Sequence, residues 1–582
     1  MIWVAAMALA SGDLALKPHP RLWLPASSEG WLREKIAADP LAARLQAATM
    51  SEADRILTER TCRYEIPDGK RLLRESRLAL HNIMHCAWAW RISGEEKYRL
   101  RTIAELEAAC AMEDWNPSHF LDVGEMATAV AAGYDWLYQT LTPEQREMCE
   151  TAIIDNALKP AKELYANNVW WSNPRNNWAQ VCGSGIALAA AAIAGQDRGL
   201  SKKLFARGLD LIEECASLYG ADGMYPEGPG YWQYGTNFHV LLLAASGPLG
   251  ESFEETPILQ KAGAAMMHLT GPTRLPFNFA DGNAGIETPT AAQCWLASQY
   301  EDEAQAQHVR ALFTRALESG GRRVSSDRLS PLSVLWLPEA VPAGIHTPRA
   351  AVFHGEQAVA IFRTGWEPDA AWFAIKGGTP AASHGQMDVG SFCYDAHGHR
   401  WIHDLGSDNY NMPGYFGKQR FTYFRLQNRS HNTLEIAGKL QDVRSEPCPV
   451  TAIFDASDPQ LPVGAVFDLS AAYAGSARKV QRSARFNGDT GTTLIEDEIT
   501  APKGDVVWRV ITDADCEIKN DEVILTKQDQ HITLRRVSDS GTWTITEATP
   551  PTSIENQNKG FRAVTLTVPK ATRINLSVEI RP

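Results

Sequence analysis

The feature that most constrains the fold is a change of pattern near residue 330 of this 582-residue chain. From about residue 30 to residue 320, apolar residues recur at i, i+3, i+4 and i+7, as in 77–93 and 124–141, which predicts amphipathic helices. After residue 348, short runs rich in β-branched and aromatic residues follow one another between Gly and Pro, which predicts strands. The sequence therefore predicts a helical part followed by a β part.

The helical runs come in pairs, and an array of helical hairpins of this length tends to curl into an (α/α) toroid. The later strands are evenly spaced, which favours an antiparallel β-sandwich. We therefore predict an α + β multidomain chain, with an incomplete N-terminal (α/α) toroid over 21–325 and a C-terminal β-sandwich over 326–582. Residues 2–10 form a short apolar run that ends in a small-residue site but lacks a basic n-region, which indicates either a weak signal or leader over 1–20 or simply a helix.

The composition limits the kinds of molecule that this protein can bind. The formal net charge of −13 argues against nucleic-acid binding, which needs a basic face. No segment is long and apolar enough to span a membrane. The ten cysteines show no C-x-x-C spacing, so we expect few or no disulfides and no thiolate zinc site.

Two polar stretches interrupt the helical part. In 170–181, Asn173, Asn176 and Asn177 lie at a predicted helix start, and one Asn would suffice as the N-cap. Three asparagines with Arg175 among tryptophans favour a ligand surface instead. In 222–239, a Gly-Pro-Gly loop stands beside several tyrosines, which either pack as a core or bring a phenol to a site as acid or base.

A third polar stretch, SHGQMDVGSF over 383–392, places His384, Gln386 and Asp388 at alternate positions. We predict a strand here, on which the three side chains would point the same way. A buried Asp388 would need donors, so we expect it to anchor adjacent backbone. His384, Gln386, Asp404 and His431 on adjacent strands could ligate a metal, although each histidine taken alone is more often structural.

Taken in order, the paired asparagines, the E-G-P-x-Y-x-x-Y element, SHGQMDVGSF with the following DLG, and SHNT resemble the heparinase II/III-like polysaccharide lyases. The resemblance covers nearly the whole chain and implies a toroid followed by a β-sandwich. It implies β-elimination on an acidic polysaccharide that contains uronate. A glycosaminoglycan such as heparan sulfate, chondroitin or hyaluronan is favoured, with alginate as the alternative. It also implies a periplasmic or secreted bacterial protein.

The resemblance also assigns roles. Asn177 matches the residue that binds the uronate carboxylate, and Trp178 stands where many members have a catalytic histidine. Tyr231 matches the loop tyrosine, with Tyr234 as its close rival. The remaining assignments are His384 and Tyr415 as catalytic, and Arg175, Asn176, Trp178 and Glu227 as substrate-binding.

Gln386, Asp404 and His431 match metal ligands of several members, which implies one structural divalent metal, zinc or manganese, and no organic cofactor. Gln386 departs from the usual histidine, so the site would be looser, prefer a harder metal or be empty.

Two other classes of function compete with a lyase. A glycoside hydrolase on the same toroid would use a carboxylate pair from among Asp222, Glu227 and Asp281. A sugar-binding protein that has lost catalysis would account for Gln386 and Trp178. Appearance of an unsaturated uronate separates the three.

Overall fold

The computed structural model describes residues 17–196, 198–246, 257–342, 344–345, 347–454, 463–538 and 540–582. The chain folds into two compact units, each assembled from three segments. Unit 1 comprises Met1–Leu218, Gln233–Gln260 and Thr288–Ile345, and unit 2 comprises Tyr219–Trp232, Lys261–Glu287 and His346–Pro582. The predicted leader over 1–20 lies almost entirely outside the described residues.

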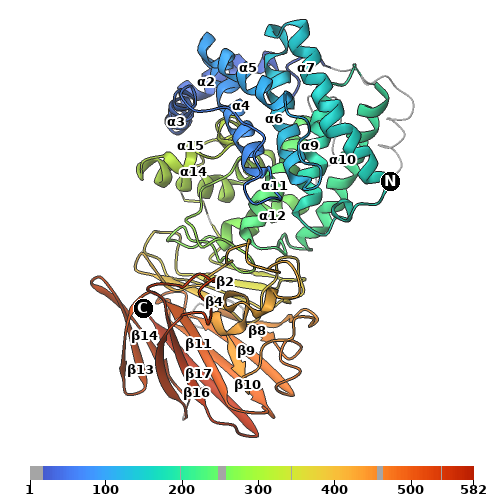
Figure 1. Cartoon of the computed structure of the whole chain (residues 1–582). Helices are drawn as coiled ribbons and strands as arrows, with labels where there is room; N and C mark the ends of the chain where they lie inside the picture. Colours follow the sequence, from blue (N-terminus) through green and yellow to red (C-terminus); the bar gives the residue numbers. More distant parts are fainter. Residues whose placement is uncertain are drawn as a thin grey trace. The chain divides into compact units, whose positions relative to one another are not determined.

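Helices dominate the first 340 residues, as the 3.6-residue periodicity predicted (Figure 1). Their bounds are α2 (Glu29–Ala38), α3 (Pro40–Ile56), α4 (Leu73–Ser93), α5 (Glu96–Cys110), α6 (Leu121–Leu137), α7 (Pro143–Ile153), α8 (Lys159–Ala166), α9 (Asn177–Ala192), α10 (Arg198–Cys215), α11 (Pro229–Ser246), α12 (Pro257–Leu269), α13 (Ala291–Gln299), α14 (Glu303–Glu318), α15 (Arg322–Ser325) and α16 (Ser330–Trp336).

The buried helix α6 lies between α4 and α9 in unit 1 (Figure 1). Every residue of α6 is buried, which explains why its sequence is so rich in Ala and Gly. A Cβ on Gly185 of α9 would meet the backbone O of Gly124 at 2.2 Å. Only glycine therefore allows α6 and α9 to approach this closely, and the two helices form the centre of the unit 1 core.

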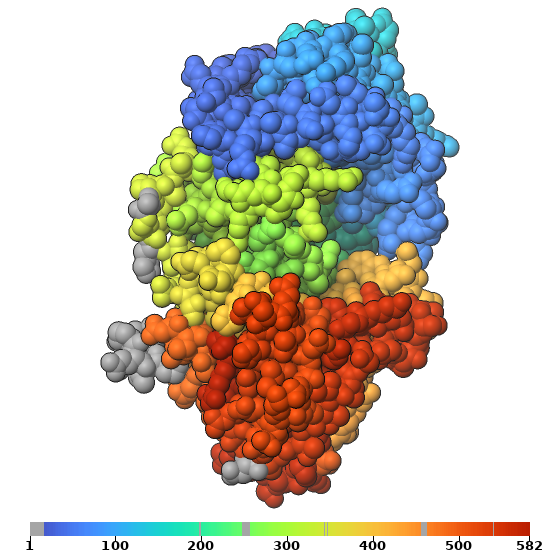
Figure 2. All heavy atoms as spheres, turned by 90° about the vertical axis from the view of Figure 1, so that its left-hand side faces the viewer, coloured from blue at the N-terminus to red at the C-terminus, as the bar shows by residue number. Residues whose placement is uncertain are grey.

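The last helices of unit 1 pack against the first. Arg310 of α14 forms a bidentate ion pair with Asp39, the N-cap residue of α3, at 2.6 and 3.0 Å. Helices α15 and α16 also contact α3. Figure 2 shows the same closure, with the blue N-terminal atoms lying against the yellow-green atoms of the later helices. The array thus curls back toward its start, as an (α/α) toroid does.

Unit 2 contains three antiparallel sheets within its described part. The first has the order β1 (Ala350–Phe353), β2 (Val359–Arg363), β3 (Trp372–Lys376), β4 (Phe392–Ala396), β5 (His399–Ile402). The second has the order β12 (Asp515–Lys519), β13 (Glu522–Lys527), β14 (Gln530–Arg536), β17 (Arg573–Arg581), β10 (Thr493–Thr500), β9 (Lys479–Phe486), β8 (Val463–Asp468), β7 (Val450–Phe454). The third has the order β15 (Thr542–Glu547), β16 (Arg562–Val568), β11 (Val506–Thr512), β6 (Leu434–Ile436).

Residues of all three sheets share one hydrophobic core, as in a sandwich. Strands β9 and β10 bury alternate residues, so one of their faces packs on the core and the other faces outward. Phe486 of β9 stacks on Phe362 of the first sheet, with ring centroids 6.2 Å apart. Phe392 of the first sheet packs against Trp508 of the third. The predicted antiparallel β-sandwich is confirmed.

Strands β2, β3 and β4 are instead buried at every position. Their second face is covered by residues 261–287, which belong to unit 2 although helices of unit 1 precede and follow them in the chain. Arg363 of β2 donates to the backbone O of His268 and Thr270, and Trp372 of β3 donates to the backbone O of His268. This segment delivers Asp281 to the site described below.

The prediction of a strand over 383–392 was wrong. Residues 383–391 form turns and irregular backbone, and regular pairing begins only at Phe392. His384 has φ 58° and Gly390 has φ 83°, two left-handed conformations that a strand does not contain. The expectation for Asp388 is confirmed, since it accepts the backbone N–H of Ala280 at 3.1 Å and also pairs with Lys376.

Other expectations concern cysteines and membranes. All ten cysteines are free. Among the described residues, every helix is too short or too polar to cross a membrane.

Candidate active site

Asp281 is the centre of a cluster of polar side chains in unit 2. Its Oδ2 accepts a hydrogen bond from Nδ1 of His384 at 3.0 Å. Its Oδ1 accepts from Nε2 of Gln386 at 2.8 Å, from Arg420 at 2.9 Å and from the Tyr415 hydroxyl at 3.3 Å. Burial opposes ionisation of Asp281, but the bond from His384 and the charge of Arg420 outweigh it and lower its pKa. Asp281 is thus an ionised anchor for its neighbours.

His384 is held in one orientation by its surroundings. Its φ of 58° is costly for a residue with a Cβ, and Arg420 stabilises that turn by donating to the backbone O of His384 and Gly385 at 3.0 and 2.9 Å. Its Nε2 lies 3.8 Å from Oε1 of Glu227. The side chain is 14% exposed. The imidazole is therefore fixed through Nδ1 while its other nitrogen faces a second carboxylate.

Tyr231 stacks on this imidazole, with ring centroids 3.9 Å apart and planes 15° from parallel. Its hydroxyl shares a 2.6 Å hydrogen bond with the hydroxyl of Tyr410. Burial and the charges of Asp281 and Glu227 raise the pKa of Tyr231, although the bond with Tyr410 acts in the opposite direction. Tyr231 is therefore a neutral phenol near pH 7, able to give a proton.

Sequence reasoning missed several members of this cluster. Tyr410 was not singled out, although it stands in the same aromatic stretch as the predicted Tyr415, whose own hydroxyl is already bonded to Asp281 and to the N–H of Asp408. Arg420 carried no local signal. Asp281 was considered only as a carboxylate of a hydrolase. The Tyr-rich run over 408–416 was the one available hint, because tyrosines in an irregular segment favour a site.

The predicted metal ligands take a different arrangement. Nδ1 of His431 lies 2.8 Å from Oδ2 of Asp404, and the N–H of Gly406 donates to Oδ1 at 2.8 Å, so both carboxylate oxygens already accept hydrogen bonds. Oε1 of Gln386 and Nε2 of His431 are buried without a hydrogen-bond partner in the described part of the chain.

Those two atoms are fewer than the four ligands of a structural zinc site. Among the described residues, no group of three His, Cys, Asp or Glu side chains could hold a metal. The residues present therefore do not fit a closed metal site, and the metal expected from the resemblance remains an untested prediction.

The asparagine stretch lies in unit 1. Asn176 is the N-cap of α9, where its side chain accepts the backbone N–H of Trp178 at 3.0 Å, so the capping interpretation holds for this residue. Asn177 is the first residue of α9 and is buried. Arg175 is exposed. The ring of Trp178 contacts that of Trp170 with centroids 4.8 Å apart.

Tyr234, the rival of Tyr231, has a separate environment in unit 1. Its hydroxyl donates to Oε1 of Glu125 at 2.9 Å. Arg77 and Arg328 also bind the Glu125 carboxylate, each at 2.8 Å. Burial and the Glu125 charge raise the pKa of Tyr234. The two tyrosines are three residues apart on α11, yet only Tyr231 contacts His384.

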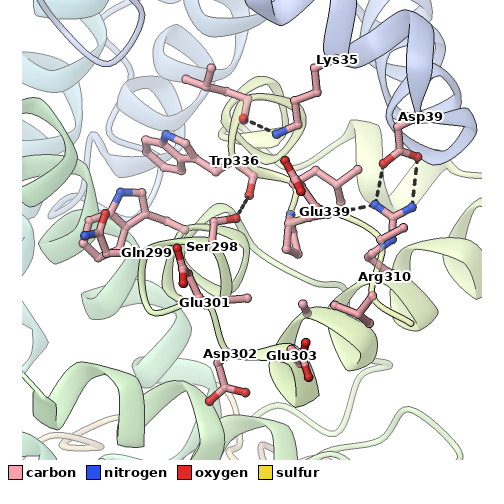
Figure 3. A pocket seen from close by; sticks show the side chains of 18 of the residues that line it. Lys35, Asp39, Ser298, Gln299, Glu301, Asp302, Glu303, Arg310, Trp336 and Glu339 are labelled. Carbon is pink, nitrogen blue, oxygen red and sulfur yellow. Dashed lines mark hydrogen bonds and ion pairs between the residues drawn. The ribbon is translucent and has the colours of Figure 1, made fainter. Parts of the chain in front are cut away.

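A hollow of about 1140 Å³ also lies in unit 1, lined by residues of α2, α13 and α14 and the segment after α16 (Figure 3). Its cations are already bound, Lys35 by the backbone O of Leu335 and Arg310 by Asp39. Carboxylates such as Glu301 and Glu339 remain around it (Figure 3). None of the predicted site residues lines this hollow, and its charge suits an acidic polymer poorly.

Residues 348–579 match the family model described as heparinase II/III-like, C-terminal. No curated protein matches the chain. A heparinase III gene product is 15% identical over 91% of this chain and 83% of its own, with a TM-score of 0.60. A second heparinase III structure is 13% identical over 92% and 85%, with a TM-score of 0.60. The heparan sulfate lyase HepC from Pedobacter heparinus is 14% identical over 96% and 88%, with a TM-score of 0.58.

At this identity the solved structures show the fold, and the family model identifies the β part. Together they confirm the resemblance drawn from the sequence motifs. Residues 348–579 belong to the heparinase II/III-like family, and the chain has the toroid and β-sandwich fold of the heparinase III structures.

Proposed function

We propose that this chain is a polysaccharide lyase that cleaves a uronate-containing polysaccharide by β-elimination. The observation that carries the proposal is the cluster of His384, Asp281 and Tyr231, in which an oriented imidazole is stacked on a neutral phenol. The family match of the β part and the heparinase III fold support an acidic polysaccharide as the substrate, with a glycosaminoglycan favoured over alginate.

In this proposal His384 is the base. The C5–H bond of the uronate breaks, and the proton passes to Nε2 of His384, because Nδ1 is already bonded to Asp281. The imidazolium that forms lies between two carboxylates, Asp281 at 3.0 Å and Glu227 at 3.8 Å, which stabilise its positive charge.

Tyr231 is then the acid. As the C4–O bond breaks, the leaving oxygen takes the phenolic proton, and a C4=C5 double bond forms in the sugar. The raised pKa of Tyr231 keeps the phenol protonated at neutral pH, so the proton is present when the leaving oxygen develops charge and takes it. Tyr410, bonded to the Tyr231 hydroxyl, can stabilise the phenolate or return a proton to it.

Asn177 is proposed to bind the uronate carboxylate and to stabilise the charge that grows on it as C5 loses its proton. Such a group acts more strongly in the transition state than in the ground state. Asn177→Ala should therefore lower kcat by at least about tenfold, and it should raise KM by a smaller factor. A variant with unchanged kcat and only a raised KM removes Asn177 from the mechanism.

The hydrolase alternative is weaker on these observations. Asp281 has a lowered pKa and four side-chain donors, so it can be neither a protonated acid nor a free nucleophile. Asp222 accepts from the backbone and imidazole of His354 at 2.8 and 3.1 Å. A non-catalytic sugar-binding protein is also disfavoured, because Gln386 has a local task in binding Asp281.

The decisive experiment incubates the full chain with heparan sulfate, chondroitin, hyaluronan and alginate and follows the ultraviolet absorbance of unsaturated uronate. We expect absorbance with at least one glycosaminoglycan and none with Tyr231→Phe. New reducing ends without absorbance would indicate a hydrolase, and absence of both would contradict the proposal. Export to the periplasm or medium, proposed from the same reasoning, is tested by fractionation of the producing bacterium.

A further inference from the structure

Helix α6 has an aspartate near each of its ends, and each aspartate is paired with a histidine from outside the helix. At the N-terminal end, Nδ1 of His119 lies 2.7 Å from Oδ1 of Asp122. At the C-terminal end, Nδ1 of His19 lies 2.6 Å from Oδ1 of Asp135. Both carboxylates are fully buried. The two pairs have the same chemistry, so differences in their surroundings can indicate different tasks.

The pair at the C-terminal end is complete. Asp135 also accepts the backbone N–H groups of Arg21 and Leu22 at 2.8–3.0 Å. Nε2 of His19 contacts the Arg21 guanidinium at 2.6 Å, and its ring stacks on Tyr138 with centroids 3.9 Å apart. Every polar atom of the pair has a partner within the protein, so this pair attaches the start of the chain to α6.

The pair at the N-terminal end is open. Asp122 accepts the backbone N–H of Leu72 at 2.6 Å and the side-chain amide of Asn116 at 2.7 Å, so its carboxylate is fixed. It therefore accepts a hydrogen bond from the Nδ1–H of His119, and in the neutral imidazole Nε2 then carries a lone pair. In the described part of the chain Nε2 has no hydrogen-bond partner, and the side chain is 17% exposed. The protein thus orients an imidazole whose second nitrogen is available.

Aromatic side chains flank this imidazole. The ring of His119 packs edge-on against Trp178, with centroids 4.9 Å apart and planes at 72°. Trp178 contacts Trp170, which is 60% exposed. Both tryptophans lie within seven residues of Asn177 in the sequence. Exposed indole faces with a hydrogen-bond acceptor at their edge suit a sugar ring, which has apolar C–H faces and hydroxyls around its rim.

We infer that Trp170, Trp178 and His119 form a sugar-binding subsite in unit 1, in which Nε2 of His119 accepts a hydrogen bond from a sugar hydroxyl. Asp122 positions the imidazole and does not touch the sugar. The identity of the polysaccharide that this subsite binds rests on the proposed function. The subsite also gives Trp178, which follows Asn177, a role in binding. Asp122 is also bonded to backbone, so it is a poor probe, whereas replacement of His119 leaves Asp122 its hydrogen bonds from Leu72 and Asn116.

The test measures binding without turnover. Full-length Tyr231→Phe protein is titrated by calorimetry with hexasaccharides of hyaluronan, heparosan and alginate. His119→Ala, His119→Gln and Trp178→Ala are then made in the same background. His19→Gln is the matched control, because it changes the same kind of pair at the other end of α6.

We expect His119→Ala to weaken binding about three- to tenfold, the effect of one hydrogen bond, and Trp178→Ala to weaken it more than tenfold. His119→Gln keeps an acceptor near Nε2 and should recover most of the loss. His19→Gln should lower the melting temperature and leave binding unchanged.

Wild-type affinity in His119→Ala overturns the inference, and so does failure of every hexasaccharide to bind the parent. If His119→Gln and His119→Ala lose the same affinity for the hexasaccharides, Nε2 of His119 does not accept a hydrogen bond from the sugar. If no polymer yields unsaturated product but these binding losses appear, the proposed reaction fails while the subsite stands.

Discussion

Two of the histidine–aspartate pairs in the described part of unit 2 differ in almost everything except their bond. His384 and Asp281 are 3.0 Å apart, and His431 and Asp404 are 2.8 Å apart. His384 is partly exposed, has a left-handed backbone and stacks on Tyr231. His431 is fully buried, and its backbone φ of −110° is ordinary.

The surroundings of the two carboxylates differ as well. Asp281 has three side-chain donors besides His384, whereas Asp404 has, besides His431, the N–H of Gly406. Loss of His384 therefore leaves a well-compensated carboxylate, and loss of His431 leaves a poorly compensated one. The comparison teaches that a histidine–aspartate bond alone does not identify a catalytic pair. The partial exposure of His384, its strained backbone and the neighbouring phenol of Tyr231 distinguish the proposed catalytic pair from the structural one.

The largest effect is expected for Tyr231→Phe, which removes the proposed acid beside His384. Loss of a proton-transfer group typically lowers the rate by roughly 10²–10⁴-fold. The melting temperature should change little, since within the described part of unit 2 the hydroxyl is hydrogen-bonded to Tyr410 alone. Initial rates of unsaturated product measure the effect. Near-full activity in Tyr231→Phe combined with inactive Tyr234→Phe would transfer the role to Tyr234.

His384→Ala should also lose activity by at least about 10²-fold while keeping nearly wild-type stability. The physical reason is that Gln386, Arg420 and Tyr415 continue to satisfy Asp281. Rates and thermal melts on one preparation separate the two properties. A variant as unstable as His431→Ala would break the comparison between the pairs.

His431→Ala should destabilise the protein by about 3–5 kcal/mol, because it leaves the buried Asp404 without its partner imidazole. Urea unfolding at pH 7 measures this loss, and unit 2 should report it through its tryptophans. Any activity loss should disappear once only the folded fraction is counted. Wild-type stability in this variant would mean that Asp404 finds another donor.

The pH dependence of the free energy of unfolding tests whether ionised Asp281 stabilises the fold. Its folded pKa is lowered, so its contribution to stability is fully present above the ordinary Asp pKa of about 3.9 and is lost as pH falls through the folded value. The stability advantage of wild type over Asp281→Asn should therefore be constant near neutral pH and narrow in acid. Urea unfolding between pH 7 and pH 3 tests this, and an advantage that grows in acid would contradict it.

The smallest effect is expected for chelation. Asp404 is occupied by His431 and Gly406, so removal of divalent metal should leave the melting temperature of wild type unchanged. Metal analysis of the purified protein and melts with and without chelator provide the measurement. A clear fall in melting temperature would show that the predicted metal is present, and Gln386→His should then strengthen it.

Several features of this protein could be predicted from sequence because neighbouring residues encode them. The apolar spacing of α4 and α6 and the short runs of β-branched and aromatic residues after residue 348 are local patterns. They were sufficient to predict a toroid followed by a sandwich. The motif order likewise singled out Tyr231 and His384, which the structure brings into contact.

Only the tertiary structure decided how the site is assembled. The alternation of His384, Gln386 and Asp388 predicted a strand, but the contacts of Arg420 with the backbone at 384–385 hold a turn there instead. Asp281 reaches His384 from 103 residues away, and Tyr410 reaches Tyr231 from 179 residues away. Periodicity records which face of one segment is buried. It carries no information on which distant segment covers that face, and packing of the whole of unit 2 determines that choice.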